Sequence, residues 1–125
     1  MSTATAEAVV RGDVFNPSDV EQKIQETSNR IAAGVKIVTG CEKEMKARKR
    51  DFDLAYANAY KNAEGSIKDR EYAADIKTMP HREIADNAEI AFKHANRTAD
   101  ALEKELFAWQ AILKSVCAMY GAVRA

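Results

Sequence analysis

The sequence predicts an all-α protein that forms a long antiparallel helical hairpin with a short connecting helix, coiled-coil-like and oligomeric. A heptad of apolar residues runs through residues 84–123. Its first position is occupied by Ala85, Phe92, Ala99, Leu106, Leu113 and Tyr120, and its second by Ala88, Ala95, Leu102, Trp109, Val116 and Val123. Upstream, a further repeat of seven consists of Ile24, Ile31, Val38, Met45, Phe52 and Ala59. Stripes this regular need a partner helix along their length, so we expect each to pack against the other.

Chain length and composition fit one helical domain that assembles with copies of itself. We expect residues 1–15 to form a flexible N-terminal arm, because they show no helical period, and residues 16–125 to form the domain. Two rods of about 40 residues leave much apolar surface wet, which further copies of the chain would cover. The 19 basic and 19 acidic side chains cancel to a formal net charge of zero, so any nucleic-acid binding depends on local clustering.

The first helix is expected to begin at the segment Asn16-Pro17-Ser18. This segment supplies a cap and a proline suited to a first helical turn, and Ser18 with Glu21 makes the S-x-x-E capping box. Gly34 and Gly40 weaken the helix by about 1 kcal/mol each without stopping it. We therefore expect the helix to run to about residue 64, before Gly65.

A short helix is expected next, with Ser66 and Asp69 as its cap. A row of apolar residues spaced by four and three favours a helix here, and an extended segment is the alternative. The row consists of Tyr72, Ile76 and Met79.

The second long helix is expected to have Pro80 in its first turn and to run to about Tyr120, before Gly121. Alanines make its beginning thin, and its later part carries the larger side chains of the seam. We expect the core and the contacts of the oligomer to use Phe92, Leu102, Leu106, Trp109, Leu113, Val116 and Tyr120.

The sequence lacks the patterns that catalytic, metal and nucleotide sites require. Neither His81 nor His94 has an acidic residue three positions before it, so the Glu-x-x-His pairs of di-iron bundles are missing, and both are interpreted as surface side chains. The five glycines form no P-loop and no G-x-G-x-x-G. We expect no enzyme activity, metal, cofactor or small-molecule substrate, and we interpret Cys41 and Cys117 as reduced, buried thiols.

A basic run at residues 43–50 is the best positive signal for a function. Its helical phase, at about 100° per residue, places several cations on one stripe opposite the apolar residues Val38, Met45 and Phe52. The cations on this stripe are Lys36, Lys43, Lys46, Arg50 and Lys61. Repeated around an oligomer, such a stripe would offer a track for the phosphates of a single strand of DNA. With their neighbours, the predicted nucleic-acid contacts are Lys36, Lys43, Lys46, Lys49, Arg50, Lys61, Lys68 and Arg70.

Two simpler interpretations of these residues stay open. The basic run is also compatible with an ordinary solvated helix face, whose field is offset by Glu42, Glu44, Asp51 and Asp53. The neighbouring tyrosines are candidates for stacking on bases, but helical tyrosines near a seam more often belong to the core and keep a wet hydroxyl. These tyrosines are Tyr56, Tyr60 and Tyr72.

Parts of the sequence resemble the UvsY-type recombination mediators of bacteriophages. The resemblance lies in Lys43-Glu44-Met45, the break at Gly65, and the stretch from Leu106 through Trp109 to Cys117. The wider run from Ala85 to Tyr120, with its Ala-Leu-Glu-x-Glu-Leu middle, is also similar to small helical proteins of tailed phages. The resemblance implies a non-enzymatic oligomer that binds single-stranded DNA and helps a RecA-type recombinase displace a single-strand-binding protein.

One departure from the UvsY-type pattern concerns the DNA contacts. Those proteins carry a Lys/Arg pair late in the first helix, where this chain has Ala57, Asn58 and Ala59, with Lys61 beyond. We expect the contacts to have moved to the basic run, helped by cations near the connection.

The sequence thus predicts a phage-encoded, oligomeric, single-stranded DNA-binding accessory protein of recombination. The alternative is a structural or adaptor coiled-coil protein of phage assembly or host interaction, which binds no nucleic acid and docks a partner helix. Secreted helical hairpins are a third class, and the absence of a Trp-x-Gly turn argues against it. No stretch approaches the roughly 20 apolar residues of a membrane span. We expect a protein of the cytoplasm, that of the bacterial host.

Overall fold

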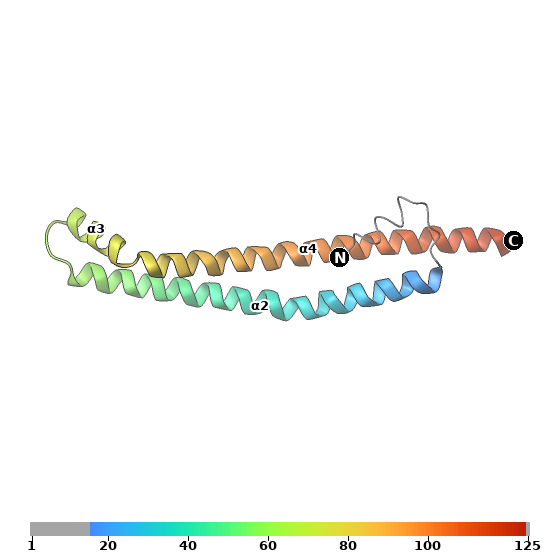
Figure 1. Cartoon of the computed structure of the whole chain (residues 1–125), viewed down its shortest axis with the longest axis horizontal. Coiled ribbons are helices and arrows are strands. Elements are labelled where there is room, and N and C mark those ends of the chain that lie inside the picture. Colours follow the sequence, from blue (N-terminus) through green and yellow to red (C-terminus); the bar gives the residue numbers. More distant parts are fainter. Residues whose placement is uncertain (1–15, 125) are drawn as a thin grey trace. The chain divides into compact units, whose positions relative to one another are not determined.

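The computed structural model describes residues 16–124, and this part of the chain contains three α-helices and no strand (Figure 1). The helices are α2 (Pro17–Asn62), α3 (Ile67–Lys77) and α4 (Met79–Arg124). The all-α prediction is confirmed, and the segment between the two long helices is helical rather than extended. The arm predicted at residues 1–15 and the seam side chain of Val123 lie outside the residues described in full.

Asn16 caps the beginning of α2. Its side-chain Oδ1 accepts a hydrogen bond from the backbone N–H of Ser18 at 2.8 Å, and its carbonyl accepts one from the N–H of Val20 at 3.1 Å. Pro17 is the first helical residue, as expected, since its missing N–H needs no partner at that position. The predicted Ser18–Glu21 capping box is wrong, because Ser18 already lies inside the first turn and its N–H is the group being capped.

Gly65 and Ser66 make the turn from α2 to α3. Gly65 has a φ of 109°, the only positive φ in the described chain, and an added Cβ would lie 3.0 Å from Asp69 Oδ2. The predicted cap of α3 is confirmed: Ser66 Oγ accepts from the Asp69 N–H at 3.2 Å, and Asp69 Oδ2 accepts from the Ser66 N–H at 3.3 Å. The turn begins slightly earlier than predicted, since α2 ends at Asn62.

Thr78 joins α3 to α4. Its backbone N–H and its hydroxyl both donate to the carbonyl of Ala74, at 3.0 and 2.7 Å, so this buried polar side chain is satisfied. Its own carbonyl accepts the Arg82 N–H of the first turn of α4, in which Pro80 lies as predicted. At the other end, α4 does not stop before Gly121 but continues to Arg124, because Gly121 keeps a negative φ and needs no left-handed cap.

The described helices belong to two compact units. Unit 1 comprises the ranges Met1–Ile31 and Leu102–Ala125, and unit 2 comprises Ala32–Ala101. The beginning of α2 and the later part of α4 therefore belong to unit 1, and α3 belongs to unit 2. The expectation of a single domain stays a prediction.

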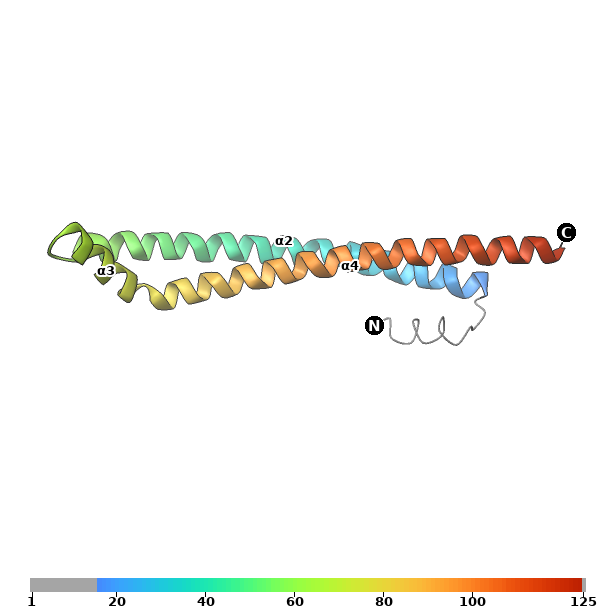
Figure 2. The same cartoon turned by 90° about the horizontal axis from the view of Figure 1, so that it is seen from above.

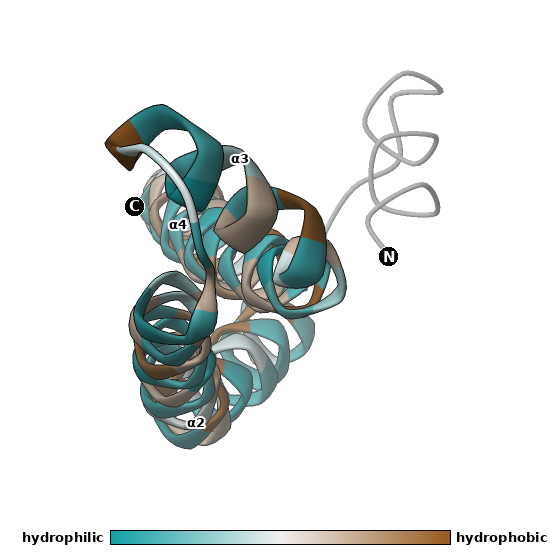
Figure 3. Ribbon diagram, turned by 90° about the vertical axis from the view of Figure 1, so that its left-hand side faces the viewer, coloured by the Kyte–Doolittle hydropathy of each residue, from teal (hydrophilic) through white to brown (hydrophobic). Residues whose placement is uncertain are grey.

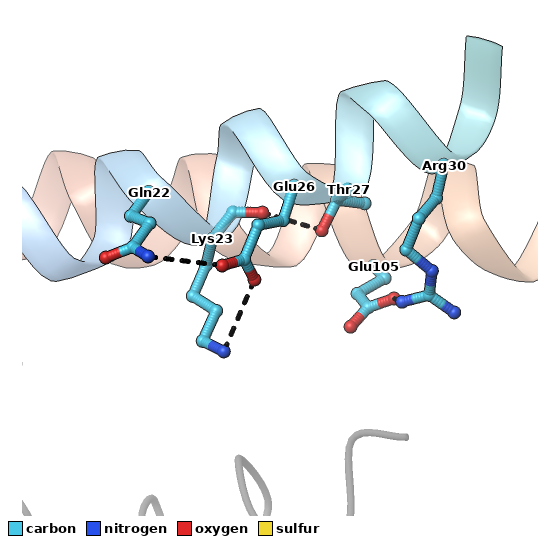
Figure 4. Close-up of polar contacts among 6 residues, drawn as sticks. All are labelled: Gln22, Lys23, Glu26, Thr27, Arg30 and Glu105. Carbon is cyan, nitrogen blue, oxygen red and sulfur yellow. Dashed lines mark hydrogen bonds and ion pairs between the residues drawn. The ribbon is translucent and has the colours of Figure 1, made fainter. Parts of the chain in front are cut away.

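In unit 1 the segments of α2 and α4 run in opposite directions (Figures 1 and 2). Arg30 Nη1 lies 3.6 Å from Glu105 Oε2 and links them (Figure 4). Three residues back from Arg30 and four on from Glu105, Thr27 is level with Trp109, and both are buried. A short side chain opposite the largest one lets the two segments interdigitate. The Thr27 hydroxyl donates to the Lys23 carbonyl at 2.8 Å, so its burial leaves no polar atom unpaired.

A second inward position on α2 escaped the sequence prediction. Its residues also recur every seventh place, and each is buried or half-buried. They are Val20, Thr27, Gly34, Cys41, Arg48 and Ala55. Small or polar side chains occupy most of this row, so an apolar pattern could not reveal it.

In unit 2 an ion pair between Lys49 Nζ and Glu89 Oε1, at 3.3 Å, links α2 to α4. The buried side chains of this unit are small apart from one methionine: Met45, Ala59, Ala74, Ala85 and Ala95, with Thr78. Helix α3 turns Ala74 inward and leaves its larger apolar side chains outside, as the apolar colouring on its outer surface shows (Figure 3). Those exposed side chains are Ile67, Tyr72 and Ile76, followed by Met79 of α4.

Candidate nucleic-acid interface

The predicted basic stripe lies on the α2 segment of unit 2, on the face turned away from the buried Met45 and Ala59. All its cations are exposed, and no ion pair or side-chain hydrogen bond within the described chain engages any of them. They are Lys36, Lys43, Lys46, Arg50 and Lys61. Because they recur at helical spacing over several turns, they present a row of free positive charge rather than a single cluster.

Arg48 accounts for two of the acidic side chains that were expected to offset this charge. Its Nε lies 3.2 Å from Glu44 Oε1 and its Nη1 lies 3.0 Å from Asp51 Oδ2. At about 100° per residue, both carboxylates lie about a quarter turn or more from the centre of the stripe. Glu42 and Asp53 border the stripe on its other side, and neither forms an ion pair with it. The stripe is therefore less neutralised than the sequence indicates.

Two predicted contacts are committed to other partners. Lys49 pairs with Glu89, as described above. Arg70 lies with its guanidinium carbon 4.9 Å from the centre of the Tyr60 ring, and its Nη2 donates to the Lys61 carbonyl at 3.5 Å. Both residues hold neighbouring helices of unit 2 together, so they are less available to a nucleic acid than the stripe. Lys68, on α3, is exposed and without an ion pair in the described chain.

Aromatic side chains of α2 face the place where α3 and α4 approach it. The Phe52 and Tyr56 rings lie 6.2 Å apart between centroids, and the Arg82 guanidinium carbon lies 5.4 Å from the centre of the Phe52 ring. Arg82 Nη2 also lies 3.2 Å from Asp75 Oδ1 of α3. Tyr56 and Tyr60 are half-buried in this cluster, which matches the core interpretation. Sequence reasoning did not single out Arg82 or Asp75, because their pairing depends on how α3 folds back.

Burial raises the pKa of the Tyr56 hydroxyl, and the negative charges of Asp75 and Glu71 raise it further. Its ordinary value of 10.0 is already far above neutrality. The hydroxyl therefore stays protonated at neutral pH, where it can donate a hydrogen bond. Of the three tyrosines considered for base stacking, Tyr72 alone is exposed, and it lies on α3.

The predicted seam residues of α4 are mostly inside the chain's own core. Leu102, Trp109 and Val116 are buried. Phe92, Leu106 and Leu113 are half-buried, whereas Tyr120 keeps 40% of its surface exposed.

The remaining candidate groups show no site chemistry. Cys41 is half-buried, but Cys117 is exposed, so its predicted burial is wrong: it lies on the outer side of α4 beside the buried Val116. His81 and His94 are exposed, as interpreted from the sequence. Within residues 16–124 no group of His, Cys, Asp and Glu could hold a metal ion. No helix in this same range is long and apolar enough to cross a membrane.

Comparison of the chain with known protein families, with curated proteins and with solved structures gave no match. The candidate interface therefore depends on the chain's own residues and geometry.

Proposed function

We propose that this protein is a non-enzymatic, oligomeric, single-stranded DNA-binding accessory protein of recombination, encoded by a phage. The observation that carries the proposal is the free row of cations on the outward face of α2 in unit 2, beside Arg48, which occupies Glu44 and Asp51. Exposed, unpaired Lys and Arg side chains attract phosphates without reading the base sequence. The resemblance of the sequence to UvsY-type mediators supports the same function.

The spacing of the stripe suits a strand that follows the helix. Lys36, Lys43 and Arg50 are separated by steps of seven residues, or about 10 Å each at 1.5 Å per residue. Lys46 lies between the last two, and Lys61 extends the row about 16 Å further. Each phosphate contact releases counterions, so the affinity should fall with salt by a slope of about 0.7 for every contact on single strands.

Assembly of several copies would multiply these weak contacts through effective concentration. We propose that the chain forms an antiparallel coiled-coil hairpin, supported by the Arg30–Glu105 and Lys49–Glu89 ion pairs, and that copies associate. A two-helix seam buries only its two central positions, whereas bundles also bury a flanking one. Several flanking positions here carry exposed apolar side chains: Val35, Ile37, Ile84 and Met119. The proposed protein partners are a RecA-type recombinase or a single-strand-binding protein.

The test is fluorescence anisotropy of a labelled single-stranded oligonucleotide at several salt concentrations, with the mass followed by light scattering. Lys43→Glu with Arg50→Glu should abolish binding while the mass is unchanged. The matched control is Lys104→Glu with Lys114→Glu, which reverses two exposed charges of unit 1 and should change the affinity little. Equal loss in both double variants, or no binding by the unaltered protein at low salt, would overturn the proposal.

The exposed apolar side chains of α3 favour a second candidate, an adaptor that docks a partner protein. Ile76 keeps 71% of its surface exposed, and Tyr72 and Met79 are similarly open. An adaptor should ignore DNA and keep its mass at every salt concentration. Replacing Ile76 by Ser should then disrupt partner binding, whereas the stripe variants should not.

A further inference from the structure

The end of unit 1 at which α2 begins has an unfilled place in its seam. Asn16 is the cap of α2, as its bond from the Ser18 N–H shows, so the fourth helical residue is Val20. In capped helices an apolar residue just before the cap often packs on this fourth residue, forming a hydrophobic staple. The residue before the cap is Phe15, and Val20 has 0% of its surface exposed.

The Arg30–Glu105 ion pair shows which residues of unit 1 are level with one another. The α2 and α4 segments rise equally per residue in opposite directions. Ten residues back from Arg30, Val20 is level with Ser115, beside the buried Val116. Fifteen residues back and fifteen on, position 15 is level with Tyr120.

Tyr120 follows Val116 in the α4 seam but keeps 40% of its surface exposed, and its neighbour Met119 keeps 55%. Helix α2 begins at Pro17, so no helical residue of α2 lies opposite Tyr120. The chain leads directly to this place, because Asn16 alone separates Phe15 from α2 and consecutive Cα atoms are about 3.8 Å apart.

We propose that Phe15 of the same chain, with Val14 beside it, closes this end of unit 1 by packing on Val20 and Tyr120. An aromatic pair at the end of the seam would bury the open side of the Tyr120 ring and leave its hydroxyl in water. The inference is independent of DNA binding, because none of these residues belongs to the basic stripe.

A cysteine pair tests the contact directly in the full-length chain. With Cys41→Ala and Cys117→Ser as background, Phe15→Cys and Tyr120→Cys should form a disulfide within one chain on mild oxidation, since bridged Cα atoms lie about 4.4–6.8 Å apart. In the control, Phe15→Cys is combined with Lys104→Cys, more than four helical turns away on α4, and should not be bridged. A disulfide between two chains, or equal bridging in both variants, would overturn the proposal, as would the absence of any bridge.

A mutant cycle provides a second readout. Phe15→Ala and Tyr120→Ala should each lower the thermal midpoint of unfolding by a few degrees, and the double variant should lower it by less than their sum. Val9→Ala, a matched apolar truncation in the same arm, should leave the midpoint unchanged. Additive effects of the two aromatic truncations would contradict a direct contact.

Discussion

Arg48 Nη1 lies 3.0 Å from Asp51 Oδ2, and the same guanidinium reaches Glu44 one turn away on the other side. Arg48 occupies an inward position of α2, and 35% of its side-chain surface is exposed. A cation at the edge of the seam thus holds two carboxylates beside it, on the flank away from the free stripe of Lys43, Lys46 and Arg50.

This relationship predicts that Arg48 supports DNA binding without contacting DNA. Arg48→Gln frees both carboxylates and should weaken binding of a single strand more than removal of one charge alone. Lys49→Gln is the matched control, because it removes a neighbouring cation whose partner is Glu89. Anisotropy titrations at low salt compare the two. Equal losses of affinity would mean that only net charge matters.

Arg82 should hold α3 against α2. Its guanidinium lies over Phe52 and pairs with Asp75, and both ion-pair partners are about half exposed. Exposed pairs contribute roughly 0–1 kcal/mol and a cation–π contact roughly 0.5–1 kcal/mol. Arg82→Ala loses both interactions, so amide exchange in α3 should become faster than in Asp75→Asn, which loses only the ion pair.

Exchange in unit 1 provides the internal control for the α3 measurement. The Arg30–Glu105 region should exchange at the same rate in both variants. Faster exchange there would indicate general destabilisation, and identical exchange of α3 in the two variants would show that the Phe52 contact contributes nothing.

Trp109 should be the most costly side chain to truncate. It is 3% exposed and lies level with the small Thr27, so Trp109→Ala leaves a cavity that little can fill. The free energy of unfolding should fall by about 3–5 kcal/mol. Phe107→Ala is the control, because Phe107 is 69% exposed and its loss should change stability by less than about 0.5 kcal/mol. Urea unfolding followed by circular dichroism measures both, and a small effect for Trp109 would contradict the register.

The sequence could predict the helices because their signals are local. The seven-residue spacing of Leu102, Trp109 and Val116 requires a buried stripe wherever a partner lies, and all three are buried. The Ser66–Asp69 cap was predictable for the same reason, since both of its hydrogen bonds span three residues. The cap of α2 was assigned wrongly because Asn16 and Ser18 are both good capping residues, and only geometry decides between them.

The candidate interface was predictable only in part, because exposure follows from helical phase but ion pairing does not. The phase placed Lys43 and Arg50 on an outward stripe, where the structure has them. The engagement of Lys49 by Glu89, 40 residues away, depends on the register between helices. The engagement of Arg70 by Tyr60 depends on the fold-back of α3, which is determined by the turn at Gly65. No single-helix pattern carries that information.

Gly40 should separate a local effect on the helix from an effect on assembly. It lies inside α2 and is exposed, and an added Cβ would meet no atom within 4 Å. Gly40→Ala should therefore stabilise the folded chain by about 1 kcal/mol through helix propensity alone. Gly65→Ala is the opposite control, because its φ of 109° and the nearby Asp69 oblige the new side chain to strain the turn. If Gly40→Ala raises the unfolding midpoint of the chain but lowers the mass found by light scattering, the open space above Gly40 is where another copy packs. An unchanged mass would place the contacts between copies elsewhere, and the exposed flanking side chains Val35 and Ile84 would be the next to replace.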